Sequence, residues 1–367
     1  MELLKPYKLG KLELRNRFVM APMTTYSGEN DFHVSSEELL YYEARSKSLG
    51  MVLTAATSIN EQAQAFDKQI TLKDDRYIPT MAVLAKVIQN QGAKAVVQLH
   101  HGGRMNVPAL YKDQSNIVSA SAIKAPREGL ATPRALETEE VKQTINDFVK
   151  ATERAIKAGY DGVELHGANT YLLQQFFSPH SNRRSDQYGG SLEKRMRFAV
   201  EMIQAARACI EKHATKPFVL GYRFSPEELE TPGITISDTV AFVKKLKTLP
   251  LDFLHISLGH YKQTSMRDQA DKKPIVDYIQ EALNGEIPLI GVGQIETLKD
   301  AEDALQSGYD LLAVGMPLIA DPDWVETIKQ GGLNKVVRPT TLPRPLFDRL
   351  YKNRQWFAKR GYTFELE

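Results

Sequence analysis

Short apolar runs rich in Val, Ile and Leu alternate along the chain with longer segments of helical period. This alternation is typical of parallel βαβ units, in which each buried strand is followed by a helix that covers it. The predicted strands are residues 17–23, 51–59, 94–101, 162–167, 218–225, 253–259, 288–295 and 310–315. Eight such units without a Pro/Gly/Ser-rich linker predict one (β/α)8 barrel rather than two doubly wound domains.

Signals for helix ends support the same units. Residues 35–38, Ser-Ser-Glu-Glu, and residues 138–140, Thr-Glu-Glu, are typical helix starts. Four glycines each fall between a helical run and a strand: Gly50, Gly92, Gly159 and Gly308. We expect all four to adopt the left-handed conformation that ends a helix.

Two connections and the C-terminal segment are too long to be simple turns. Residues 102–137 and 168–190 follow the third and fourth predicted strands, at the barrel end where active sites are built, and are candidate substrate walls. We therefore expect a barrel over residues 1–338 and a tail over residues 339–367. The tail packs either on the barrel or on a neighbouring subunit of a homo-oligomer.

Charge and cysteine content exclude several classes of partner. The 47 basic and 45 acidic residues give a net charge of only +2, which provides no electrostatic footprint for nucleic acid or an anionic membrane. No signal-peptide core and no membrane-length apolar run is present, so a cytoplasmic protein is expected. The single Cys209 cannot build a disulfide, an iron–sulfur cluster or a Cys-based zinc site, and is expected to be a buried residue on a helix.

Polar residues occupy one face of several predicted strands. Alternation places these side chains inside the barrel, near the carboxyl ends of strands: Gln98, His100, Glu164, His166, Arg223, His255 and Ser257. Two interpretations are open. The groups satisfy one another, for example through a Glu164–Arg223 pair, or they face a bound polar cofactor that offsets the cost of burying them.

Glycines end the seventh and eighth predicted strands, in residues 290–295 and 313–317. In barrels the loops after these strands often bind phosphate through backbone N–H groups. The spacing does not fit a Rossmann fingerprint. His100, His101 and His166 do not form a convincing metal-ligand pattern in the sequence, so no metal site is expected.

Four segments together resemble one family. They are residues 16–24, 98–104, 166–191 and 320–323, and the third, His-Gly-Ala-Asn-Thr-Tyr-Leu-Leu-Gln-Gln-Phe-Phe-Ser-Pro-His-Ser-Asn-Arg-Arg-Ser-Asp-Gln-Tyr-Gly-Gly-Ser, is the most specific. The chain resembles the old yellow enzymes, FMN-containing ene-reductases on a (β/α)8 barrel. The resemblance implies tightly bound FMN, with NADPH or NADH as the reductant.

The resemblance also implies which residues bind the cofactor. They are Pro22, Met23, Thr24, Gln98, Arg223, Gly291, Gly293, Gly315 and Met316. Gln98 would bind the flavin pyrimidine edge, and Thr24 would lie beside the C4 carbonyl. Arg223 would stabilise the negative charge of reduced flavin. Gly293, Gly315 and Met316 would offer backbone N–H groups to the phosphate.

The substrate residues follow from the same resemblance. His166 and Asn169 would bind the carbonyl oxygen of an α,β-unsaturated substrate, Tyr26 would contact that substrate, and Tyr171 would protonate its α-carbon after hydride reaches the β-carbon. The implied activity is NAD(P)H-dependent reduction of the C=C bond of enones. The alternatives are a flavin-dependent amine-type dehydrogenase, a flavin-free lyase or isomerase acting on a phosphorylated substrate, and a flavin-binding module without turnover.

Three positions depart from the family pattern. Met316 stands where many members have Arg beside the phosphate, so the resemblance implies that a charge-assisted contact is lost, and weaker FMN binding is an expectation to be tested. Thr170 and Gln294 stand where Gly is usual, which affects loop shape but removes no chemical group.

Overall fold

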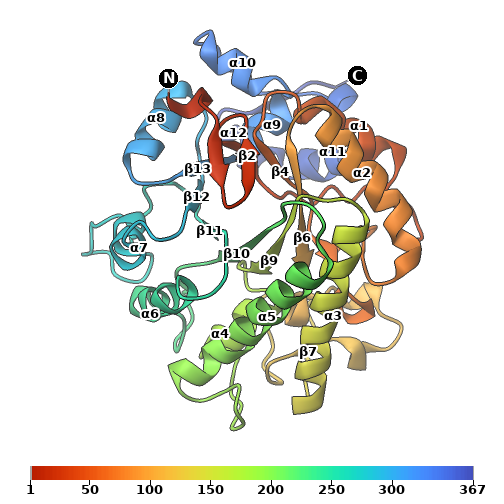
Figure 1. The fold of residues 1–367 in the computed structure, drawn as a ribbon, viewed down its shortest axis with the longest axis vertical. Coiled ribbons are helices and arrows are strands. Elements are labelled where there is room, and N and C mark those ends of the chain that lie inside the picture. The colour runs from red at the N-terminus through yellow and green to blue at the C-terminus, as the bar shows by residue number, and fades with distance from the viewer. Residues whose placement is uncertain (1, 367) are drawn as a thin grey trace.

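Eight parallel strands close into a barrel, as the alternation predicts (Figure 1). A computed structural model describes residues 2–366. The barrel strands are β3 (Phe18–Met20), β4 (Met51–Leu53), β6 (Lys94–His100), β9 (Gly162–Gly167), β10 (Val219–Phe224), β11 (Phe253–Ile256), β12 (Leu289–Val292) and β13 (Leu311–Val314). Each strand pairs with the next one in this order, and β13 pairs with β3, which closes the sheet.

An outer layer of helices surrounds the barrel and supplies its main hydrophobic core (Figure 1). The helices that follow the eight strands are α1 (Ser36–Arg45), α2 (Ile78–Asn90), α3 (Thr138–Lys157), α5 (Leu192–His213), α6 (Ile236–Leu246), α7 (Ile275–Leu283), α8 (Leu298–Gln306) and α10 (Trp324–Lys329). Two short helices, α4 (Leu172–Phe177) and α9 (Met316–Ala320), begin just after β9 and β13. None of the helices in the described part of the chain is long and apolar enough to cross a membrane.

Several short strands and 3-10 helices lie outside the eight β/α units. The short strands are β1 (Tyr7–Leu9), β2 (Leu12–Leu14), β5 (Thr57–Ser58), β7 (Val118–Ser119), β8 (Arg134–Ala135), β14 (Val336–Val337) and β15 (Thr363–Phe364). Short 3-10 helices cover Glu2–Leu4, Glu61–Ala63, Asp75–Tyr77, Gly103–Met105, Pro108–Leu110, Gln114–Asn116 and Pro339–Thr341. Residues 51–59, expected as one strand, form two, because the Ala55 N–H leaves the ladder and donates to the Tyr42 hydroxyl at 2.7 Å.

The helix-start signals are confirmed. Helix α1 begins directly after Ser35, whose hydroxyl accepts from the Glu38 N–H at 3.1 Å. Helix α3 begins at Thr138, and the Glu140 carboxylate reaches back to accept the Glu137 N–H at 2.8 Å. Both contacts satisfy N–H groups that the helix itself leaves without partners.

Three of the four helix-ending glycines are left-handed, with φ of +85° at Gly92, +82° at Gly159 and +100° at Gly308. The prediction is wrong for Gly50, whose φ is not positive. A Cβ at this position would collide with the backbone carbonyl oxygen of Asn16. The glycine therefore serves close backbone packing rather than helix termination.

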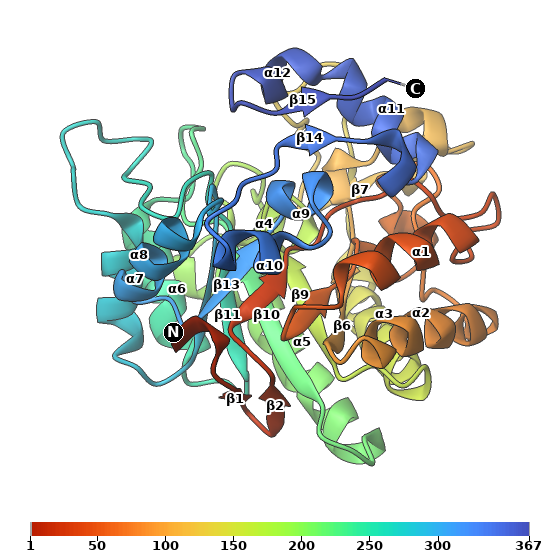
Figure 2. The same ribbon diagram turned by 90° about the horizontal axis from the view of Figure 1, so that it is seen from above.

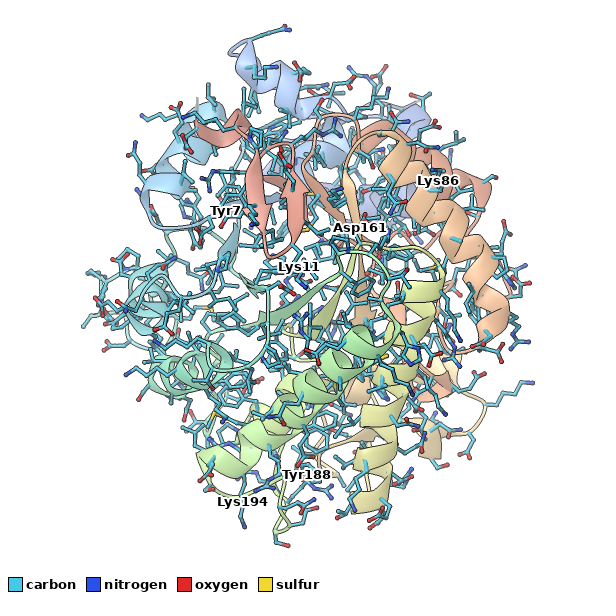
Figure 3. All side chains as sticks on the ribbon, in the orientation of Figure 1. Tyr7, Lys11, Lys86, Asp161, Tyr188 and Lys194 are labelled. Atoms are coloured by element: carbon cyan, nitrogen blue, oxygen red, sulfur yellow. The ribbon has the colours of Figure 1, made fainter. Side chains whose placement is uncertain are left out.

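The barrel interior is apolar at the end where the strands begin and polar at the end where the strands finish. Side chains from the strands meet the hairpin β1–β2 in a second core cluster, formed by Leu9, Leu12, Leu14, Val19, Ala21, Met51, Leu53, Val96, Val219, Phe253, Ile290, Leu311 and Ala313. The hairpin lies at the end of the barrel where the strands begin, and Figure 3 shows Tyr7 and Lys11 on it. This end is closed, which leaves the carboxyl end of the barrel for a ligand.

The tail packs on the barrel of its own chain. Helices α11 (Arg344–Lys352) and α12 (Arg354–Ala358) lie with β14 and β15 at the end opposite the hairpin (Figure 2). Leu346, Phe347, Phe357 and Tyr362 are buried. The buried Arg45 guanidinium donates to the carbonyl oxygens of Leu318 and Thr341 at 2.8 and 2.9 Å, which ties the start of the tail to α9.

Gly221 provides a test of interior packing. It lies opposite Phe253 on the inner face of the barrel, and a Cβ on it would collide with the Phe253 ring. We expect Gly221→Ala to lower the free energy of unfolding by about 1–3 kcal/mol, because the ring must leave its position. Denaturant unfolding measures the change.

The double variant Gly221→Ala, Phe253→Ala is the control. With the ring removed, the added methyl group no longer collides, so the double variant should lose less stability than the sum of the two single variants. A Gly221→Ala protein as stable as the parent would contradict this packing.

Candidate active site

A buried carboxylate lies at the centre of the polar half of the barrel. Glu164 on β9 is fully buried and accepts from Gln98 Nε2 at 2.7 Å and from His255 Nδ1 at 2.8 Å. Gln98 on β6 lies directly opposite Glu164 in the sheet register. The expectation of inward-facing polar groups is confirmed, but the alternative in which Glu164 pairs with Arg223 is wrong. No ion pair joins the two among the described residues.

Arg223 is a buried cation with unused donors. Its Nη2 donates to Ser257 Oγ at 3.2 Å, while its Nε is buried without a hydrogen-bond partner in the described structure. Burial lowers its pKa and the nearby Glu164 raises it, but a guanidinium remains charged at neutral pH. An unpaired buried donor of this kind is costly unless a ligand satisfies it, so the site fits a bound polar or anionic group.

His166 is a neutral hydrogen-bond donor. Burial, followed by the neighbouring His100 and Arg223, holds its pKa well below the usual range. The Ala168 N–H donates to its Nδ1 at 3.3 Å, so the neutral ring carries its proton on Nε2. Since the side chain is 3% exposed, this proton points into a nearly closed site.

Asn169 is held in a left-handed conformation with a φ of +57°. Its backbone N–H donates to Ser225 Oγ at 2.9 Å, and its Oδ1 accepts from Ser257 Oγ at 2.8 Å. Because Oδ1 is occupied, the amide nitrogen is left to donate to a ligand. Ser257 therefore links Arg223 to Asn169.

Tyr171 lies beside these donors, just before α4. Its ring centroid is 4.3 Å from that of His100, 5.0 Å from that of His166 and 6.1 Å from that of Phe66, all in edge-to-face contact. Burial, followed by the neighbouring Tyr26, raises its pKa above the usual value of 10. The phenol is therefore protonated at neutral pH and can act as an acid.

Tyr26 and Tyr171 line one cavity of about 580 Å³. The Tyr26 ring meets Phe66 edge to face at 5.7 Å, and the Arg349 guanidinium lies 4.0 Å from its centroid. Phe66, in the loop after β5, and Arg349, in the tail, are two lining residues that were not predicted from the sequence. Neither carries a sequence signal, because no periodicity connects these segments with β9.

The glycines after β12 and β13 line a second cavity of about 250 Å³. Gly293, Gly315 and Met316 contribute to its wall together with residues of the tail. Gly293 has a φ of +118°, and a Cβ on it would lie 2.7 Å from the backbone nitrogen of His260, so only glycine fits this approach.

The other predicted cofactor residues are absent from the linings of these two cavities. A Cβ on Gly315 would lie 3.2 Å from Met23 Sδ, so Met23 packs beside this glycine. Pro22 and Thr24 flank Met23 in the segment after β3. Gly291 does not line the cavity. Its missing side chain makes room for the ring of Tyr309.

The two departures from glycine occur in strained backbone. Thr170 has a φ of +66° and Gln294 a φ of +53°, both in the left-handed region that favours glycine. Each has a compensating contact. The Thr170 N–H donates to Gln174 Oε1 at 2.9 Å, and Gln294 Nε2 donates to the Gly259 carbonyl oxygen at 3.0 Å.

The long segment 166–191 also anchors the other long loop, residues 102–137. Gln175 Oε1 accepts from the Arg104 N–H at 3.1 Å and from Ser119 Oγ at 2.8 Å. Arg184 donates to the carbonyl oxygen of Ala120 at 3.0 Å and pairs with Asp186. Much of this specific sequence run therefore fixes the wall of the site rather than touching a ligand.

Neither a metal centre nor a reactive thiol is visible within residues 2–366. No group of three or more His, Cys, Asp or Glu side chains is placed to hold a metal ion in that range. Cys209 is buried on α5, as expected, and burial raises its pKa to about 11. It is an inert packing residue.

Comparison with known proteins identifies relatives over almost the whole chain. Residues 2–335 match the NADH:flavin oxidoreductase / NADH oxidase family. A probable NADH-dependent flavin oxidoreductase of Bacillus subtilis is 40% identical over 351 residues, which cover 94% of each chain. An NADH:fumarate oxidoreductase of Klebsiella pneumoniae is 43% identical over 333 residues, which cover 90% of this chain but only 36% of that protein.

Two solved structures show the same fold over almost the whole chain. The old yellow enzyme homologue from Zymomonas mobilis aligns with a TM-score of 0.81 at 25% identity, over 94% of this chain and 99% of that one. Morphinone reductase aligns with a TM-score of 0.78 at 28% identity, over 92% of each chain.

Thr170 allows the backbone strain to be measured. We expect Thr170→Gly to be more stable than Thr170→Ala by about 1 kcal/mol, because alanine keeps the Cβ that disfavours the left-handed region. Chemical unfolding of both variants gives the difference. In unstrained backbone alanine would be the more stable of the two, so that order would contradict the left-handed geometry.

Proposed function

The chain belongs to the NADH:flavin oxidoreductase / NADH oxidase family, the old yellow enzymes, and from this premise we propose that it reduces the C=C bond of α,β-unsaturated carbonyl compounds. It is an oxidoreductase that uses FMN with NAD(P)H. When bound, FMN supplies hydride transfer between the nicotinamide and the second substrate.

The residues around the buried carboxylate fit the cofactor. Gln98 turns its Nε2 to Glu164, so its Oε1 remains to accept from the pyrimidine edge of the flavin. The Nε of Arg223 lacks a partner and would donate to the same edge, where its charge favours the anionic reduced form. Thr24, in the loop after β3, would adjust the reduction potential of the flavin. The backbone around Gly293, Gly315 and Met316 would hold the phosphate.

His166 and Asn169 would bind the carbonyl oxygen of the substrate. One offers Nε2–H and the other an amide N–H, and their remaining polar atoms are already engaged by the protein. Two fixed donors stabilise the negative charge that grows on this oxygen when the double bond is reduced. Ser257 and the Ala168 N–H position the two side chains.

Tyr171 would give its proton to the α-carbon. Its pKa is raised by burial, so the hydroxyl holds its proton at neutral pH until carbanion character develops on the substrate. Tyr171 and Tyr26 line the same 580 Å³ cavity, so a substrate in this cavity would contact the Tyr171 hydroxyl.

The observation that carries the proposal is that His166, Asn169 and Tyr171 all present donors at neutral pH. An amine-type dehydrogenase needs a group that accepts a proton from the substrate, and this cluster offers none. The names of two relatives, NADH:fumarate and NADH:acrylate oxidoreductases, also denote substrates with a C=C bond beside a carbonyl group. The chain spans about a third of the length of each of those proteins.

Tyr171→Phe separates the two halves of the reaction. We expect the rate of cyclohexenone reduction to fall by roughly 100-fold, because the general acid is lost. Anaerobic bleaching of the flavin by NADPH should remain within about twofold, since nicotinamide oxidation needs no such proton donor. Stopped-flow absorbance measures each half-reaction by itself.

Tyr26→Phe is the matched control, since it removes a hydroxyl from the same cavity without removing the proposed acid. Its cyclohexenone reduction should stay within about tenfold of the parent. Equal losses in both half-reactions for Tyr171→Phe would contradict the assigned role.

The pH profile provides an independent test. Burial raises the pKa of Tyr171, so its acid form persists as the pH rises, and burial lowers the pKa of His166, so its neutral form persists as the pH falls. We expect the single-turnover rate of enone reduction to be flat from about pH 6 to about pH 9. A descending limb near pH 6.5 would show instead that His166 titrates in this range.

A further inference from the structure

The 250 Å³ cavity is bordered by one unpaired cation, which comes from the C-terminal tail. Arg360 lines this cavity together with Gly293 and Gly315. The other charged residue in the lining, Glu296, is already paired with Lys335 and accepts from the Tyr362 hydroxyl at 3.1 Å. No carboxylate within residues 2–366 pairs with Arg360.

Arg360 is held in place by its neighbours. Its guanidinium carbon lies 3.6 Å from the ring centroid of Trp356, and its Nη1 donates to the Trp356 carbonyl oxygen at 3.2 Å. Stacking on an indole ring orients the planar guanidinium and leaves its other N–H groups available at the edge. The head group is thus preorganised to bind an anion.

The backbone that carries Arg360 is fixed to the barrel. Lys335 Nζ donates to the Arg360 carbonyl oxygen at 2.9 Å, and residues 363–364 pair with β14. Tyr362, two residues further along, is buried. Figure 2 shows this part of the tail, around α12 and β15, at the end of the barrel opposite the N-terminal hairpin.

The composition of the cavity indicates the kind of ligand. Its glycines permit close approach of backbone groups, Met316 adds no charge, and Arg360 adds one positive charge without a counter-ion. A phosphate monoester dianion matches a guanidinium fork facing backbone N–H groups.

We propose that Arg360, stacked on Trp356, binds the phosphate of FMN and so closes the phosphate end of the cofactor site with the C-terminal tail. This inference rests on the phosphate site of the proposed function and adds a charged side chain to it. It also changes the expectation drawn from Met316. The charge that the loop after β13 lacks is supplied by a residue 44 positions later in the same chain.

Titration of the full-length apoprotein with FMN and with riboflavin tests the proposal, because the two flavins differ only in the phosphate. Flavin fluorescence gives each Kd. We expect Arg360→Ala to weaken FMN binding by roughly 10- to 100-fold and riboflavin binding by less than about twofold. Arg360→Lys should lie between the parent and Arg360→Ala, because it keeps the charge and loses the fork.

Arg354→Ala is the matched control. Arg354 also stacks on an aromatic residue of the tail, Tyr351, at 4.5 Å and donates from Nη1 to its carbonyl oxygen at 3.2 Å, but it does not line the cavity. Its FMN Kd should equal that of the parent. The slope of log Kd against log salt should also be shallower for Arg360→Ala alone, since a charge contact with phosphate is lost.

Three outcomes overturn the proposal, and they differ from one another. If Arg360→Ala binds FMN within twofold of the parent while the parent still prefers FMN to riboflavin, the phosphate site stands and Arg360 is not part of it. If the parent does not distinguish FMN from riboflavin, the phosphate site itself is wrong. If only the ratio of the KM values for NADPH and NADH changes, Arg360 binds the nucleotide phosphate of the reductant instead.

Discussion

The Glu164 carboxylate is the interaction on which the site depends. It is fully buried, and its two acceptor atoms fix the orientation of Gln98 and His255 on two other strands. Burial lowers the pKa of the Arg223 guanidinium, and the negative charge of Glu164 opposes part of this effect. A buried cation without a direct carboxylate partner is normally costly, and here the remaining cost is offset only when a ligand meets the free Nε. Glu164, Gln98, His255 and Arg223 therefore form a polar floor inside the barrel. The hydrogen bonds of this floor are complete only when a cofactor meets Arg223 Nε.

Strained backbone is concentrated around this floor. Tyr26, Asn169, Thr170 and Gln294 all adopt positive φ values, and all lie in loops at the carboxyl ends of strands. The strands beneath them are paired on both sides and closed into a ring, so the loops are held in conformations that an isolated segment would leave. In Asn169 this conformation directs the amide toward Ser257 and leaves its nitrogen as a donor. The strained backbone thus fixes an amide N–H donor at the place proposed for the substrate carbonyl oxygen.

The C-terminal tail contributes one arginine to each of the two cavities. Arg349 on α11 stacks on Tyr26 at the 580 Å³ cavity proposed for the substrate, and Arg360, just beyond α12, lines the 250 Å³ cavity proposed for the phosphate. Both arginines use an aromatic partner to hold a charged head group at the edge of a cavity. Arg45 ties the start of this tail to the barrel through backbone carbonyl groups, so the position of both arginines is coupled to the packing of α1.

The sequence by itself determined the barrel and the polar inward face of four of its strands, because side-chain period is a local property of the backbone. It assigned His166, Asn169 and Tyr171 only through the resemblance of residues 166–191 to a known family. Strand β9 is found at the predicted residues, 162–167. The tertiary structure decided which groups meet. It placed Glu164 against Gln98 and His255 rather than Arg223, gave Gly50 a packing role, and brought Phe66, Arg349 and Arg360 to the cavities. These contacts depend on how the sheet closes and on the path of the long loops and tail, and no local pattern in a sequence specifies either.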